Sequence, residues 1–246
     1  CCTPAPSGNC TRFHLPSENW HAAALTGDEA RHLSQVLRGK AGDMITVFDG
    51  HGRRASAKVL QVSRDRVSLE ISEVVSPAPP QPRITLAQAI PKGKTMDLIV
   101  QKAVELGVAG IEPLVTRHTI VQPGEGKSEK WTRVALEACK QCGQDMLPEI
   151  SPAVAFDTWI AGTKKISGLK LIASLAPGAQ AMREVLRAHP ATTEATILVG
   201  PEGDFSPQET AAALAAGFIP VSLGNIVLRV ETASLFCISA LRYEFA

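Results

Sequence analysis

The sequence predicts two domains, a small β domain followed by a larger α/β domain. The run 76–82 carries four prolines in seven residues, which prevents helix and central strand alike. Before this run, short stretches alternate between apolar and polar residues, whereas after it apolar stretches alternate with amphipathic ones. We therefore place the domains at residues 1–76 and 83–246.

The first domain has the pattern of a small antiparallel β barrel. Turn signals rich in glycine, aspartate and serine separate three stretches with the period-two alternation of strands, namely 44–48, 55–60 and 66–71. One helix is expected from Thr26 or Asp28 to about Leu37, with Gly39 near its end.

The second domain is predicted to be a mainly parallel sheet covered on both faces, because strands alternate with helices along the chain. The expected strands are 84–90, 111–115, 169–174, 195–199 and 220–223. The expected helices are 95–106, 127–146, 179–188 and 231–243. A further helix starts after Ser206, since Ser206 and Glu209 form a capping-box pattern around Pro207.

Composition alone does not reveal a function. The formal net charge is +1, so bulk charge does not indicate a nucleic-acid-binding protein, and any such face would have to come from local clusters of basic residues. No charged and then apolar leader and no long apolar run is present in the sequence, which makes a cytoplasmic protein the expectation. If the source is a eukaryote, an organelle is the corresponding compartment.

Two segments, 198–205 and 223–233, each begin at the carboxyl end of an apolar strand, where ligands bind in open α/β sheets. Gly200, Gly203 and Gly224 let the backbone approach a ligand closely and permit positive φ angles. Spacing alone is equally consistent with tight turns between strands and helices.

In combination, Gly200-Pro-Glu-Gly203, Leu223-Gly224 and Leu228-Arg-Val-Glu-Thr-Ala233 resemble the signature of the SPOUT methyltransferases. The specific resemblance is to the RsmE family, which methylates N3 of a uridine in small-subunit (16S) ribosomal RNA. Strings at 36–38, 47–50, 99–107 and 137–143 are also similar to that family. The resemblance covers nearly the whole chain, with both domains in order.

The resemblance implies an N-terminal PUA-like RNA-binding β barrel, a SPOUT domain with a trefoil knot, and a homodimer. It also implies S-adenosylmethionine (SAM) as the cofactor and 16S-type ribosomal RNA or the small ribosomal subunit as the partner. The residues expected to bind the cofactor are Leu175, Gly200, Glu202, Gly203, Leu223, Gly224, Leu228 and Thr232.

Methyl transfer to uracil N3 requires loss of the N3 proton and an aligned approach of the base to the methyl group. Arg229 is expected to stabilise negative charge on the uracil oxygens. Glu231 is a candidate proton acceptor, although orienting Arg229 or capping the last helix are alternatives, and capping is slightly favoured. For RNA phosphates we expect contacts from Arg12, Arg38 and Lys94.

The sequence departs from the usual family pattern at three places. Asn225-Ile226 stands where Pro-Arg is common, Val230 where Thr is common, and Asp204 where Gly is common. The main alternative function is therefore a non-catalytic RNA-binding ribosome-assembly factor of the same fold, and a third is 2′-hydroxyl methylation of RNA. The presence of Arg229, Glu231 and Thr232 argues against the non-catalytic factor. The barrel before the α/β domain and the string Leu-Arg-x-Glu-Thr at 228–232 favour the base-directed enzyme over the 2′-hydroxyl methyltransferase.

Other motifs do not indicate a different chemistry. The pair Cys139 and Cys142 has redox or zinc spacing, but it lies in a predicted helix and no second pair of ligands completes a site. The string 124–128 resembles the end of a P-loop, but Val121 occupies the position of the first glycine. No G-x-G-x-x-G string occurs, and the six histidines are dispersed, so we expect no metal.

Overall fold

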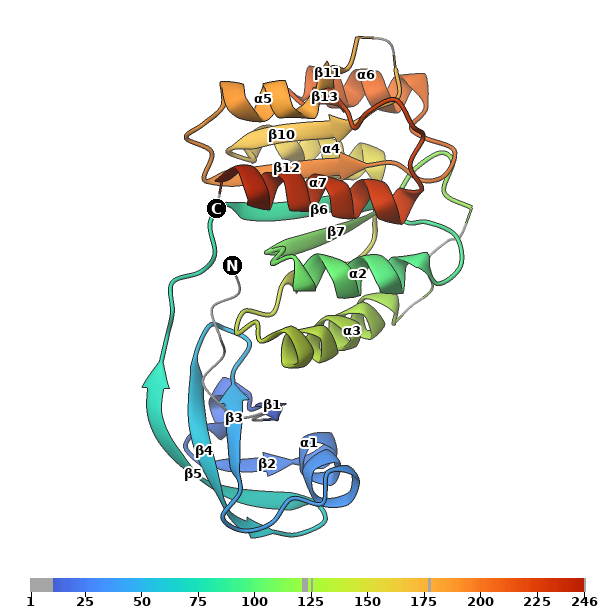
Figure 1. Cartoon of the computed structure of the whole chain (residues 1–246). Coiled ribbons are helices and arrows are strands. Elements are labelled where there is room, and N and C mark those ends of the chain that lie inside the picture. Colours follow the sequence, from blue (N-terminus) through green and yellow to red (C-terminus); the bar gives the residue numbers. More distant parts are fainter. Residues whose placement is uncertain (1–10, 121–123, 125, 177, 246) are drawn as a thin grey trace. The chain divides into compact units, whose positions relative to one another are not determined.

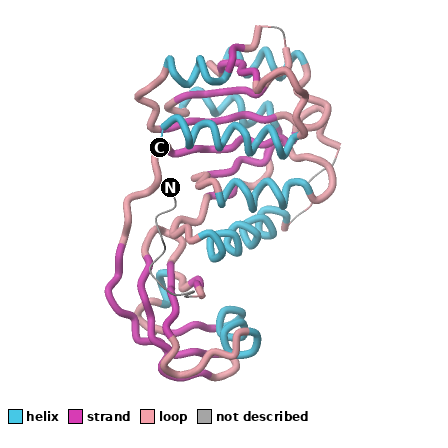
Figure 2. Tube along the Cα trace, in the orientation of Figure 1, coloured by secondary structure: helices cyan, strands magenta, loops and turns pink. Residues whose placement is uncertain are grey.

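The structure is a computed structural model that describes residues 11–120, 124, 126–176 and 178–245. The chain forms two compact units (Figure 1, Figure 2). The first unit contains the chain up to Pro79 together with Cys139–Leu147, and the second contains Pro80–Ala138 and Pro148–Ala246. Each unit has its own sheet and its own apolar core.

The first unit is built on a curved five-stranded sheet with the order β1-β3-β4-β5-β2 (Figure 1). Neighbouring strands pair antiparallel except β1, which is parallel to β3. Alternate residues of β4 from Ala55 to Val59 are buried, so one face of the sheet covers the core. The strands are β1 (Arg12–His14), β2 (Ala24–Thr26), β3 (Met44–Phe48), β4 (Arg54–Val62) and β5 (Arg66–Val75).

The expected helix of the first unit is present as α1 (Gly27–Arg31), which continues into a π-helical turn, His32–Val36. A 3₁₀ turn, Ser17–Asn19, precedes β2. Leu33 packs in the core, and a Cβ atom at Gly39 would lie 2.9 Å from its side chain. The chain therefore needs a glycine where it leaves the helix.

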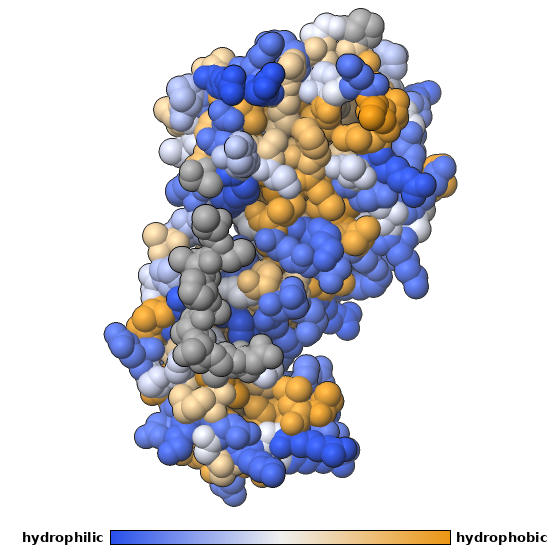
Figure 3. Space-filling view, in the orientation of Figure 1, coloured by the Kyte–Doolittle hydropathy of each residue, from blue (hydrophilic) through white to orange (hydrophobic). Residues whose placement is uncertain are grey.

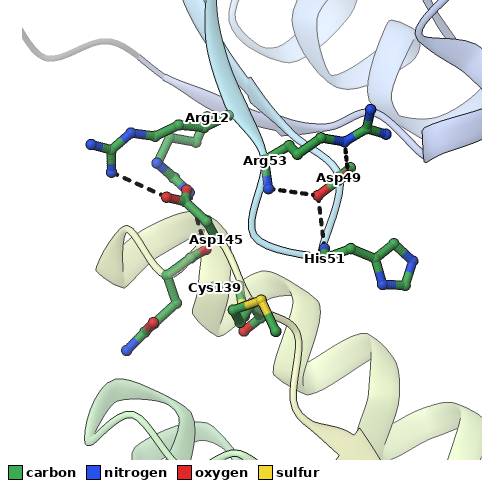
Figure 4. Close-up of polar contacts among 9 residues, drawn as sticks. Arg12, Asp49, His51, Arg53, Cys139 and Asp145 are labelled. Atoms are coloured by element: carbon green, nitrogen blue, oxygen red, sulfur yellow. Dashed lines mark hydrogen bonds and ion pairs between the residues drawn. The ribbon is translucent and has the colours of Figure 1, made fainter. Parts of the chain in front are cut away.

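A segment distant in sequence completes the first unit. Helix α3 (Lys127–Cys142) ends just before Gly143, whose φ is +86°, and does not continue to Met146 as predicted. Asp145, which follows this turn, has a nearly buried side chain that accepts from Arg12 Nη2 at 2.7 Å and from Arg54 Nη1 at 3.1 Å (Figure 4). These ion pairs fasten the segment to β1 and β4.

The second unit contains an eight-stranded sheet with the order β11-β13-β10-β12-β6-β7-β8, in which β9 also pairs with β7. Every pairing is parallel, which confirms the predicted α/β class. The strands are β6 (Arg83–Ala89), β7 (Gly110–Val115), β8 (Glu149–Ile150), β9 (Val154–Ala155), β10 (Leu169–Ala173), β11 (Gln180–Ala181), β12 (Glu194–Val199) and β13 (Ile219–Ser222).

Helices cover both faces of this sheet, as the alternating pattern predicts (Figure 1). Helices α2, α5 and α7 pack together on one face, and α4 and α6 pack against each other on the other. Their bounds are α2 (Thr95–Glu105), α4 (Phe156–Gly162), α5 (Met182–Ala188), α6 (Pro207–Ala215) and α7 (Val230–Phe245), and a 3₁₀ turn, Thr163–Lys165, follows α4. The trefoil knot stays a prediction.

All the expected strands are present, with bounds that differ by a few residues at most. Helix α5 begins at Met182 and not at Ala179, because Gln180 and Ala181 pair with β13. Among the described residues, no helix has the length and apolar character needed to cross a membrane.

Candidate active site

A cavity of about 460 Å³ lies at the carboxyl ends of β10, β12 and β13 in the second unit. This is the edge of a parallel sheet at which ligands are expected. Its walls come from the segment after β10, the loop after β12, the loop between β13 and α7, and Thr95 at the start of α2. The two loops that the sequence singled out therefore face one cavity.

The glycines of these loops have specific steric reasons to be glycine. A Cβ atom at Gly200 would lie 3.2 Å from Asp204 Oδ1 and from the ring of Phe205, and one at Gly203 would lie 3.1 Å from the Cβ atom of His118. Gly224 has a φ of +122°, with no atom of this unit close to the position of a Cβ. The positive φ therefore favours glycine here, and the hydroxyl of Ser222 accepts from the N–H of Gly224 and donates to its carbonyl oxygen, each at 3.4 Å.

The predicted capping box fixes the far end of the loop after β12. The Ser206 side chain accepts from the N–H of Glu209, and Glu209 Oε2 accepts from the N–H of Ser206 at 2.8 Å. The other carboxylate oxygen, Oε1, accepts from the N–H of Arg117 at 2.8 Å. One buried carboxylate thus joins α6 to the segment after β7.

Asp204 adopts a φ of +58°, a left-handed conformation that explains why glycine is common at this place in the resembling family. Its Oδ1 accepts from the N–H of Phe205 at 2.7 Å, and its carbonyl oxygen lies 2.9 Å from His118 Nδ1. Aspartate tolerates this conformation because its short side chain bonds locally. The departure at 204 is therefore compatible with the loop geometry.

Glu202 lines the cavity, and its carboxylate Oε1 accepts from the backbone N–H of Lys92 at 2.9 Å. This contact joins the loop after β12 to the loop 91–94, which carries Lys94 and leads to Thr95. The sequence did not indicate Thr95 as a lining residue. The adjacency of β6 and β12 in the sheet places it there.

Arg229 and Glu231 lie in the cavity wall at the beginning of α7. Arg229 precedes the helix, and its carbonyl oxygen accepts from the N–H of Ala233 at 2.9 Å. Its side chain is exposed, and no ion pair with a described residue engages it. Glu231 stands in the first turn, where a carboxylate complements the helix dipole.

The cavity brings together most of the predicted site. The predicted cofactor residues that line it are Leu175, Gly200, Glu202, Leu223, Gly224 and Leu228. Gly203 and Thr232 are not among the lining residues. Gly203 lies against His118, and Thr232 is exposed. Lining residues that the prediction missed include Ser174, Pro201, Ile226 and Val227.

The three basic residues predicted to contact RNA differ in their surroundings. Arg38 is exposed and has a φ of +54°. Lys94 is exposed at the position that precedes α2. The Arg12 side chain is 14% exposed and is bound to Asp145 (Figure 4). Its guanidinium also lies over the ring of Phe48.

The cysteine pair lies in the last turn of α3, where Cys139 is buried and Cys142 is exposed. Burial raises the pKa of the Cys139 thiol to about 12. Among the described residues, no cluster of histidine, cysteine, aspartate or glutamate has the arrangement of a metal site. The P-loop-like string 124–128, and Val121 before it, lie partly outside the described residues.

Comparisons with known proteins agree with this geometry. Residues 78–242 match the family described as RNA methyltransferase domain, and residues 25–72 match the RNA methyltransferase PUA domain. A relative from Synechocystis named Ribosomal RNA small subunit methyltransferase E is 31% identical over 213 residues, covering 85% of this chain and 69% of the relative.

Two solved structures are similar over both units. A methyltransferase from Legionella pneumophila in complex with SAM is 32% identical, has a TM-score of 0.85, and aligns over 96% of this chain and 98% of its own. A ribosomal RNA small subunit methyltransferase E from Neisseria gonorrhoeae bound to SAM is 30% identical, with a TM-score of 0.84 and the same coverage of 96% and 98%.

Proposed function

Because the chain belongs to the ribosomal RNA small subunit methyltransferase E family, we propose that it transfers a methyl group from SAM to N3 of a uridine in 16S ribosomal RNA. The observation that carries this proposal is one cavity that combines glycine turns with Arg229 and Glu231. The alternative of a non-catalytic assembly factor lacks such support, because the similar structures hold SAM.

The lining residues fit SAM. A volume of about 460 Å³ falls within the range of about 300–1,000 Å³ that is usual for small-molecule sites. Leu175, Leu223 and Leu228 offer apolar surface to an adenine ring, and Gly200 and Gly224 expose backbone groups to its edge. When bound, the cofactor supplies a methyl group on a positively charged sulfonium. The acidic residues in the wall, Glu202, Asp204 and Glu231, complement that charge.

Arg229 is the residue to which we assign stabilisation of the anionic base. Its exposed guanidinium can donate two hydrogen bonds to uracil oxygens, and its charge persists at any physiological pH. Glu231, two residues further on, accepts the N3 proton or supports the first turn of α7. Both residues act from the same wall of the cavity, so the base must enter beside them.

The domain from residue 1 to 76 would serve as a PUA-like RNA-binding module, and the domain from 83 to 246 would carry the transfer. Arg38 and Lys94 are exposed and are proposed to bind RNA phosphates. For Arg12 an RNA contact stays a prediction, and its ion pair with Asp145 is the contact that the structure shows.

We also propose a homodimer that acts in the cytoplasm, or in an organelle of a eukaryotic source. Phe236 and Tyr243 lie seven residues apart on α7, hence on one face of the helix, and are 45% and 89% exposed. Figure 3 shows apolar side chains gathered over α7. Exposed aromatic residues on a regular helix face are typical of an interface.

The proposal is tested with purified protein and small ribosomal subunits that lack the modification. Calorimetry with SAM should show binding, and nucleoside mass spectrometry after the reaction should show N3-methyluridine. Well-folded protein that does not bind SAM would contradict the enzyme and leave the assembly factor. Binding together with methylation of a ribose hydroxyl would support the third function.

A further inference from the structure

A buried amide side chain lies between the two loops of the cavity. Gln88, on β6, is fully buried. Its Nε2 donates to the carbonyl oxygen of Ala89 at 2.8 Å and to that of Val199 at 3.5 Å, and its Oε1 accepts from the hydroxyl of Ser234 on α7. Because an unpaired amide is costly in an apolar core, these contacts hold the side chain in one orientation.

Both ends of this contact lie at residues that line the cavity, Val199 and Val230. Val199 is the last residue of β12 and precedes Gly200. Ser234 shares its single hydroxyl proton between Gln88 Oε1 and the carbonyl oxygen of Val230, which is 3.0 Å away. Val230 is the first residue of α7 and follows Arg229. The amide therefore links the backbone beside the glycine turn to the backbone beside Arg229.

Ile238 and Leu241 of α7 are fully buried, and Arg242 near its C-terminal end donates to the carbonyl oxygens of Pro82, Leu106 and Gly107. At the Arg229 end of the helix, the directional contact is the one between Ser234 and Gln88. Apolar packing has little directional preference, whereas a buried hydrogen bond requires one relative position of its two groups. Neither Gln88 nor Ser234 lines the cavity. Any effect of these residues on a ligand must act through the loops.

We infer that Gln88 and Ser234 are positioning residues, which set the distance between the glycine loop after β12 and the Arg229 end of α7. The inference rests on the proposed function, because it takes SAM as the ligand of the cavity. It adds two residues from elements 146 positions apart in sequence to those that determine cofactor affinity.

The test compares the variants Ser234→Ala, Gln88→Leu and the double variant with Thr163→Val as a matched control. Thr163 is also buried, and its hydroxyl donates to the carbonyl oxygen of Ile160 at 2.7 Å, away from the cavity lining. For each protein, calorimetry gives the Kd for SAM, and thermal unfolding without SAM gives the midpoint.

We expect each single variant to weaken SAM binding about fivefold or more, which corresponds to the loss of one hydrogen bond. The double variant should bind SAM no more weakly than the weaker-binding of the two single variants, because both residues act through one contact. Thr163→Val should lower the unfolding midpoint and leave the Kd unchanged.

If the wild type binds SAM and both Ser234→Ala and Gln88→Leu bind it with the same Kd, this inference is overturned, and the proposed function is not affected. The inference is also overturned if Thr163→Val weakens SAM binding as much as they do, because the effect is then general destabilisation. Wild-type protein that does not bind SAM overturns the proposed function and this inference together.

Discussion

The Glu202 carboxylate accepts a hydrogen bond of 2.9 Å from the backbone N–H of Lys92 and so joins two loops at the mouth of the cavity. One loop carries Gly200, and the other carries Lys94 and leads to Thr95. This hydrogen bond needs a side-chain oxygen at residue 202 but no negative charge. The role of the bond can therefore be separated from the role of the charge.

Glu202→Ala should therefore impair RNA methylation more than Glu202→Gln. The amide oxygen of glutamine can accept from the Lys92 N–H, whereas alanine cannot. For the alanine variant we expect KM for the small subunit to rise about three- to tenfold, which corresponds to about 1 kcal/mol. Steady-state kinetics check this, and equal KM values for the two variants would show that the bond does not hold the loop in place.

Asp145 should make a large contribution to the stability of the first unit. Its side chain is 6% exposed and pairs with Arg12 and Arg54, so Asp145→Ala leaves the poorly solvated Arg12 guanidinium without a carboxylate to balance its charge. We expect a loss of about 3 kcal/mol in the free energy of unfolding, measured in urea. Asp28→Ala is the matched control, because the Asp28–Arg31 pair is exposed, and it should reduce the free energy of unfolding much less than Asp145→Ala. Equal losses would contradict this role of Asp145.

Asp49 should make the free energy of unfolding decrease as the pH falls into the acid range. Burial raises the pKa of this carboxyl, but hydrogen bonds from the Arg53 side chain and from the N–H groups of His51 and Arg53 outweigh burial and lower it (Figure 4). A lowered pKa contributes stability above the ordinary value of about 4, and this contribution is lost as pH falls towards the folded value.

Asp49→Asn should accordingly reduce the free energy of unfolding by about 1–3 kcal/mol at pH 7, and the gap from wild type should narrow at pH 3. Urea unfolding at the two pH values measures both quantities. The exposed residue Glu70, replaced by glutamine, serves as the control. If the difference in the free energy of unfolding between wild type and Asp49→Asn is as large at pH 3 as at pH 7, the lowered pKa of Asp49 is refuted.

Cys139 and Cys142 should differ sharply in reactivity, although only two residues separate them. Burial keeps the Cys139 thiol protonated, with a pKa of about 12, whereas Cys142 is exposed. Iodoacetamide on native protein should label Cys142 and spare Cys139. Trypsin cleaves after Lys140 and separates the two, so mass spectrometry reads each peptide. Preferential labelling of Cys139 would contradict its burial.

Local patterns in the sequence were sufficient for most of the fold and for the position of the site. Period-two alternation predicted β3 to β5, and the capping box at Ser206 predicted the start of α6. Glycines after apolar strands identified both loops of the cavity. These features depend on neighbours in sequence, which is why a single chain reveals them.

Contacts between distant residues could not be predicted in the same way. The segment around Asp145 joins the first unit through ion pairs with Arg12 and Arg54, more than 90 residues away. Gln88 and Ser234 each look unremarkable in sequence, since only the order of β6, β12 and α7 brings them together. Short elements such as β1 also escaped prediction, because three residues are too few for a period to be recognised.

Arg229 is the residue on which methyl transfer to uridine N3 should depend most, and the most direct test is single-turnover methylation of unmodified small subunits by wild type and Arg229→Ala. We expect the variant to bind SAM within about threefold of wild type and to transfer the methyl group at least about 100-fold more slowly. A variant that forms N3-methyluridine as fast as wild type would contradict the role assigned to Arg229.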